Sequence, residues 1–125
     1  MKTLTVLLPL PCSDNAKTRF STRTRRVYTT AKASGFRLEI VARIKRAMEL
    51  TGTQFKSRMK TRLICWWHRP DIRSDIVNFH KELCDAVKRA IGVDDRYFLI
   101  TDEDYDIQKD CPDFERLILR IEQEE

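Results

Sequence analysis

The sequence feature that most restricts the fold is a pair of stretches with helical periodicity, separated by a short run that is wholly apolar. In the stretches 31–50 and 75–91, apolar residues recur at intervals of three and four, which predicts two amphipathic helices. The run 64–67 is apolar at consecutive positions, which predicts a central strand with both faces covered. We therefore expect two main helices packed on a sheet. The apolar stripe of the first helix is Ala33, Phe36, Ile40, Ile44 and Ala47, and that of the second is Ile76, Phe79, Leu83, Val87 and Ala90.

Alternating or β-branched residues predict further strands around these helices. The segments are 3–8, 26–30, 97–101 and 114–121, and the central strand extends over 58–67. Gly52 and Gly92 follow the two helices, where a residue without a Cβ ends a helix easily. The predicted order is β-β-α-β-α-β-β, a mixed sheet of the α+β or α/β class. With 125 residues, the chain is expected to form a single small domain over 1–125.

Several classes of function are excluded by the composition. The three glycines cannot build a phosphate-cradling loop, so no nucleotide cofactor is expected. No apolar run approaches the roughly 18 residues needed to cross a bilayer, so no membrane partner is expected. The four cysteines contain no CxxC pair. We therefore expect reduced thiols, no zinc site and a cytoplasmic protein.

The net charge of +5 conceals two halves of opposite sign. Residues 1–70 carry 16 lysines and arginines against 3 acids, whereas residues 71–125 carry 8 against 16. A basic half can neutralise a polyanion such as DNA, and an acidic half can hold a divalent cation. The alternative interpretation is that both halves are solvated faces that pair with each other.

The densest basic stretch lies at 17–29, and no acid occurs between Asp14 and Glu39. Like charges at this density repel one another, which predicts a mobile basic loop unless phosphates order it. We expect this loop to contact DNA, although an ordinary surface loop has the same composition. Its basic residues are Lys17, Arg19, Arg23, Arg25 and Arg26.

Acidic residues flank the second predicted helix at both of its ends. Asp71 and Asp75 precede the apolar stripe, whereas Asp94 and Asp95 follow Gly92. If the strands before and after this helix pair, these carboxylates can converge at one end of the sheet. Carboxylates that hold Mg²⁺ or Mn²⁺ beside a lysine suit metal-assisted phosphodiester hydrolysis, and Lys81 on the polar face can supply that lysine. The alternative is a helix cap, a turn and a surface lysine.

Three motifs in this order resemble the RusA family, the Holliday-junction resolvases of bacteria and their prophages. The sequence LPLPCSDN at 8–15 is similar to the family start LPxPPSxN, with Cys12 in place of a proline. The sequence DIVNFHK at 75–81 is similar to the family core DxDNxxK, and GVDDR at 92–96 resembles the turn that carries two aspartates. The resemblance extends over about residues 4–100.

The resemblance implies a small homodimeric endodeoxyribonuclease that depends on Mg²⁺ or Mn²⁺ and acts in DNA recombination and repair. It would bind four-way DNA junctions and nick two strands symmetrically. Matched motif by motif, Asp75 and Asp95 are the metal-binding and catalytic aspartates and Lys81 is the catalytic lysine. Asn15 and Asn78 match motif asparagines and, with the basic residues of 17–29, are expected to contact DNA.

One position departs from the family pattern. The second aspartate of the DxDN motif falls on Val77, which cannot ligate a metal. Asp71 and Asp94 are the two candidates to replace the missing ligand. A catalytically weakened, structure-selective DNA-binding dimer of the same fold is therefore an alternative function.

A protein-binding accessory factor is a further alternative. In that function, the acidic run at 102–106 docks a basic partner protein. If the protein has no such partner, we expect the run to be a solvated strand edge or loop. His80 lies beside the apolar stripe and is predicted to be a partly buried, hydrogen-bonded residue and not a metal ligand. The acidic residues of the run are Asp102, Glu103, Asp104 and Asp106.

Overall fold

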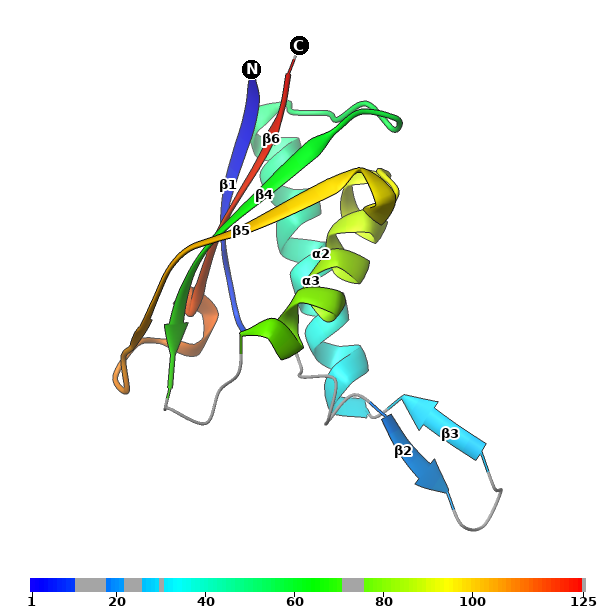
Figure 1. Cartoon of the computed structure of the whole chain (residues 1–125), viewed down its shortest axis with the longest axis vertical. Helices are drawn as coiled ribbons and strands as arrows, with labels where there is room; N and C mark the ends of the chain where they lie inside the picture. Colours follow the sequence, from blue (N-terminus) through cyan, green and yellow to red (C-terminus); the bar gives the residue numbers. More distant parts are fainter. Residues whose placement is uncertain (11–17, 22–25, 30, 71–75, 125) are drawn as a thin grey trace.

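A mixed four-stranded sheet forms one layer, and two helices pack on one of its faces (Figure 1). The computed structural model describes residues 1–10, 18–21, 26–29, 31–70 and 76–124. The strands lie in the order β1-β6-β4-β5. They are β1 (Lys2–Leu8), β6 (Leu117–Gln123), β4 (Thr61–Arg69) and β5 (Phe98–Ile107). The helices are α2 (Ala31–Thr51) and α3 (Val77–Ile91).

The predicted fold class and element order are confirmed, with a difference near the N-terminus. A separate antiparallel hairpin of β2 (Thr18–Ser21) and β3 (Arg26–Thr29) lies within the segment predicted as a mobile loop. Only the second of these strands was expected. The four residues of β2 are too few to show an apolar alternation, so the pairing with β3 defines this strand.

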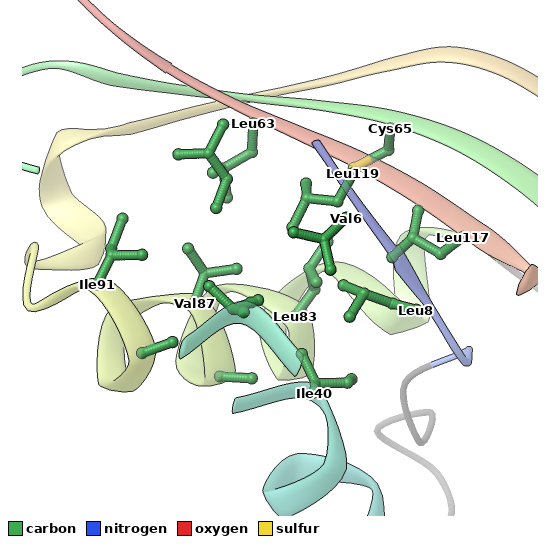
Figure 2. Close-up of a cluster of buried hydrophobic side chains, with 14 of the residues drawn as sticks. Val6, Leu8, Ile40, Leu63, Cys65, Leu83, Val87, Ile91, Leu117 and Leu119 are labelled. Carbon is green, nitrogen blue, oxygen red and sulfur yellow. The ribbon is translucent and has the colours of Figure 1, made fainter. Parts of the chain in front are cut away.

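The core lies between the sheet and the helices. All five residues of the apolar stripe predicted for the second helix are buried there. Figure 2 shows Leu63 and Cys65 of β4 facing Leu83 and Val87 of α3. Along β1, β4 and β6, buried side chains alternate with exposed or half-buried ones, which is the pattern of a sheet with one covered face.

The central position of β4 is confirmed, since β6 and β5 flank it. The prediction that both of its faces are covered is wrong. Trp67 is fully buried under the helices, whereas Trp66 on the other face is only half-buried. The guanidinium of Arg120 lies 5.2 Å from the centroid of the Trp66 ring, so a cation from β6 covers this apolar residue in place of a helix.

The connection from β4 to β5 decides the geometry of the site. These two strands are parallel neighbours, and α3 joins them. A parallel crossover must return to the starting end of the sheet, so α3 runs back along the strands. As a result α3 begins near the end of β4 and finishes near the start of β5, as Figure 1 shows.

A buried ion pair joins the two helices. Arg37 of α2 donates from Nε to Glu82 Oε1 at 2.8 Å and from Nη2 to Oε2 at 2.9 Å. The side chain of Glu82 has no exposed surface, while that of Arg37 is 20% exposed. The hydrogen bonds to Glu82 raise the pKa of the Arg37 guanidinium, so the guanidinium keeps its charge at neutral pH. None of the helices that the structure describes combines the length and apolarity needed to cross a membrane.

Replacing Gly92 by alanine is expected to lower the free energy of unfolding by about 1 kcal/mol, because this position is left-handed. Gly92 has φ 74°, and its N–H donates to the carbonyl of Lys88 at 3.0 Å to close α3. Gly35, inside α2, is the matched control, since an added Cβ there meets nothing within 4 Å. Gly35→Ala should stabilise the protein, by about 0.5–1 kcal/mol. Urea unfolding of both variants checks the prediction, and effects of equal sign would contradict it.

Candidate active site

The structure describes part of the predicted site. Asp94, Asp95 and Lys81 have described side chains. For Asn78 in α3, Arg19 in β2 and Arg26 in β3, the structure establishes the backbone element alone. The remaining predicted residues lie outside the described residues and stay predictions. They are Asn15, Lys17, Arg23, Arg25, Asp71 and Asp75.

Asp94 and Asp95 form an acidic pair at the end of α3. Asp94 caps the short 3-10 helix η1 (Asp95–Tyr97), and its Oδ1 accepts the backbone N–H of Arg96 at 3.2 Å. This hydrogen bond, followed by one with the side chain of Asp95, holds the pKa of Asp94 below its ordinary value. The guanidinium of Arg96 lies 3.4 Å from Asp94 Oδ2. Asp95 is exposed, so the pair offers side-chain oxygens to solvent.

Lys81 lies near the other end of the helix. It is exposed and precedes the last residue of α3, Ile91, by ten positions, which is about 15 Å along the axis. In the described part of the chain, no hydrogen bond or ion pair joins Lys81 to Asp94 or Asp95. The parallel crossover explains this separation, because η1 leads into β5 at the end of the sheet where α3 finishes.

The thiol of Cys84 in α3 is influenced both by its burial and by the charge of Asp95. Burial raises the pKa of the Cys84 thiol to about 11, and the negative charge of Asp95 contributes to the increase. Cys84 lies three positions, about one turn, after Lys81 on α3. Since a thiol with this pKa is protonated at neutral pH, Cys84 is not a nucleophile under these conditions.

Among the described acidic residues of β5, Asp102 contacts the first half of α3. In β5, the side chains of Phe98, Ile100 and Asp102 are partly buried and alternate with exposed ones. Asp102 ends this row, and its side chain is 25% exposed. A bulge follows, because Cys65 pairs with Asp102 but Trp66 already pairs with Asp104. Bulges of this kind redirect side chains and are frequent beside active sites.

The sequence interpretation of the acidic run is therefore partly corrected. Asp102, Glu103, Asp104 and Asp106 lie on an edge strand, as expected, but Asp102 is less exposed than the others: its side chain is 25% exposed and that of Asp106 is 44% exposed, while Glu103 and Asp104 are exposed residues. Its carboxylate bonds His80 of α3, with 2.8 Å between His80 Nε2 and Asp102 Oδ2. The prediction that His80 is partly buried and hydrogen-bonded is confirmed. The alternation of Phe98 and Ile100 with exposed residues was the sequence pattern that could have shown that Asp102, two positions further on, lies on the same side of the strand.

The donor set of the described acids suits a hard divalent cation, although it is incomplete. Mg²⁺ and Mn²⁺ prefer carboxylate and water oxygens, and Asp94 and Asp95 present such oxygens side by side. Across the residues with described positions, no group of three or more histidines, cysteines or acids is arranged to hold a metal ion.

Comparison with known proteins identifies one family. The family model described as Endodeoxyribonuclease RusA matches residues 9–115, which is most of the chain. The matched region includes β4, α3, η1 and β5, the elements that carry Lys81, Asp94, Asp95 and Asp102. No curated protein matched the sequence.

Proposed function

Because the chain belongs to the RusA endodeoxyribonuclease family, a family of Holliday-junction resolving endonucleases, we propose that it cuts four-way DNA junctions in a metal-dependent reaction. The observation that carries the proposal is the family match over residues 9–115. The solvent-facing pair Asp94–Asp95 supports it from the structure, since carboxylate oxygens side by side can bind a divalent cation.

The proposed site assigns a role to each acidic and basic residue. We propose Asp95, with Asp94 beside it, and Asp75, with Asp71 as the further candidate, as cation-binding carboxylates; the first two follow α3 in the chain and the last two precede it. When bound, the cation polarises the scissile phosphate and lowers the pKa of a water molecule. Lys81 is exposed on α3, where its ammonium group can stabilise the negative charge that develops on the phosphate.

DNA binding is proposed to depend on the basic N-terminal half. Residues 1–70 carry a balance of +13, and β2 and β3 present a hairpin rich in arginine. Each phosphate that a lysine or arginine neutralises releases counterions, so junction affinity should fall steeply with salt. Two equivalent cuts in a junction need two identical sites, and we propose a twofold-symmetric homodimer for this reason.

A second candidate is a DNA-binding dimer that does not cleave efficiently. Two observations favour it: position 77, where the family motif has an aspartate, is a valine, and the described acids supply two neighbouring ligands and not three. In this case the protein retains junction affinity without a divalent metal.

The decisive experiment is cleavage of an end-labelled mobile four-way junction by the purified protein, with Mg²⁺ or Mn²⁺ and with EDTA as control. We expect symmetric, metal-dependent nicks that Asp95→Ala removes and that Asp110→Ala, at an exposed position outside the proposed site, does not. A junction that is shifted on a gel but never cut supports the second candidate. Failure to bind the junction at low salt contradicts both.

A further inference from the structure

A histidine and an aspartate that the proposed metal site does not use are held together beneath the edge strand. Asp102 Oδ2 lies 2.8 Å from His80 Nε2, and Asp102 Oδ1 lies 3.0 Å from the same nitrogen. Trp67 Nε1 donates to Asp102 Oδ1 at 2.7 Å. Trp67 is fully buried and stacks on Phe79 with 5.8 Å between ring centroids, so the carboxylate is anchored to the core.

This arrangement determines which nitrogen of His80 carries a proton. An ionised carboxylate only accepts hydrogen bonds, so Nε2 must be the donor to Asp102. In the neutral ring, Nδ1 then has a lone pair. Among the described residues nothing donates to Nδ1, and the side chain is 25% exposed, so water can reach it. The geometry is that of a proton acceptor whose orientation is held by a carboxylate.

His80 also lies within the stretch of helix to which the proposed catalytic roles are assigned. It belongs to the first turn of α3, directly before Lys81 and three positions after residue 77. The motif assigned to metal binding and catalysis runs from 75 to 81, so His80 lies within it. The valine at position 77 leaves this motif with one carboxylate fewer to attract and orient water.

We propose that His80 is a general base for the hydrolysis, with Asp102 as its positioning residue; this inference rests on the proposed function. As the water oxygen forms its bond to phosphorus, Nδ1 of His80 takes the proton from that water. The bond between phosphorus and the sugar oxygen breaks with its electron pair on the oxygen, which then takes a proton from solvent. Asp102 stays ionised and stabilises the imidazolium that forms.

A second histidine provides a matched control. His68 of β4 lies 2.7 Å through Nδ1 from Asp106 Oδ1, and its side chain is 24% exposed. The hydrogen bond from His68 holds the pKa of Asp106 below its ordinary value. His68 alternates with the buried Trp67 along β4, so it faces the side of the sheet that the helices leave uncovered. The two histidines match in exposure and each bonds an aspartate, but they differ in position in the fold.

The test compares His80→Ala and His68→Ala in single-turnover cleavage of a four-way junction, with junction affinity measured in EDTA. Loss of a general base lowers rates by about a hundredfold or more, so we expect a fall of that size for His80→Ala with affinity unchanged. Added imidazole should restore much of the rate, because it can occupy the vacated space and accept the proton. His68→Ala should cleave normally and show no response to imidazole.

Two further measurements separate this role from a structural one. The Asp102→Asn variant should cleave more slowly, because His80 loses the carboxylate that orients it. Added imidazole should not restore the rate, because the His80 ring still occupies the site. The ¹⁵N spectrum of the histidine rings should show His80 protonated at Nε2, with that preference reduced in Asp102→Asn. Thermal unfolding of each variant confirms that it is folded under the assay conditions.

The possible results separate a failure of the role proposed for His80 from a failure of the proposed function. If the wild-type protein cuts junctions and His80→Ala cuts equally well, the role of His80 is overturned while the proposed function stands. A rate loss in His80→Ala that imidazole does not restore, or a ring protonated at Nδ1, also overturns it. If the wild-type protein cuts no junction, the proposed function fails, and the catalytic role of His80 fails with it.

Discussion

Replacing Arg37 by methionine is expected to lower the free energy of unfolding by about 3 kcal/mol, because it breaks a buried ion pair from one side. The change removes both charged hydrogen bonds that Arg37 donates to Glu82, whose side chain has no exposed surface. The carboxylate cannot recover their strength from solvent at that position. We place the loss at the lower end of the range for buried pairs because Arg37 is 20% exposed.

Urea unfolding at neutral pH measures this loss, and two comparisons make the experiment specific. The double variant Arg37→Met with Glu82→Leu should recover most of the stability, since an apolar pair of similar volume needs no desolvation of charge. Glu39→Gln breaks the exposed pair that Glu39 forms with Arg43 on the same helix at 2.7 Å, and should change stability by less than about 0.5 kcal/mol. Equal losses in Arg37→Met and Glu39→Gln would refute the explanation.

Replacing Val77 by aspartate is expected to raise the rate of junction cleavage at limiting Mg²⁺ by about a hundredfold. The substitution restores a carboxylate that the family motif carries. A hundredfold gain corresponds to about 2.7 kcal/mol, which is within the attraction of one added carboxylate for a divalent cation near a protein surface. The measurement is single-turnover cleavage over a Mg²⁺ titration, in which the half-saturating concentration should fall.

Val77→Asn is the matched control, since it has nearly the same shape as aspartate and no charge. Helix α3 begins at residue 77 and has no acid in its first turn. An aspartate there also interacts favourably with the helix dipole, which should stabilise the protein by about 0.5 kcal/mol. A gain in stability without a change in the Mg²⁺ dependence would show that residue 77 is not beside the metal, and would contradict the proposed site.

Much of the fold follows from local sequence patterns. The stripe of the second helix was predicted residue by residue, because apolar spacing reports which side of a helix meets the core. The strand at 97–101 was predicted too short: β5 continues to Ile107 as an edge strand of acidic residues. Charged edges lack the apolar alternation from which strands are recognised, although they are common in native sheets.

The candidate site was less accessible to sequence reasoning. Lys81 and the pair Asp94–Asp95 were identified by type and spacing, but their proposed convergence depended on how two strands pair. The structure shows that β4 and β5 are parallel, which places Lys81 near the start of α3 and the acidic pair beyond its end. The contact of Asp102 with His80 spans 22 residues of sequence, and no local periodicity reports a contact of that separation.

The sequence by itself determined most of the elements, the buried face of α3 and the motifs that indicate the family, because each depends on residues a few positions apart. The tertiary structure decided which strands are neighbours. The last strand, β6, lies between β1 and β4, and β5 forms the edge. Backbone hydrogen bonds are alike in every strand, so they do not encode a partner; packing of the whole core selects it. That selection brought Asp102 to His80 and set Asp95 apart from Lys81.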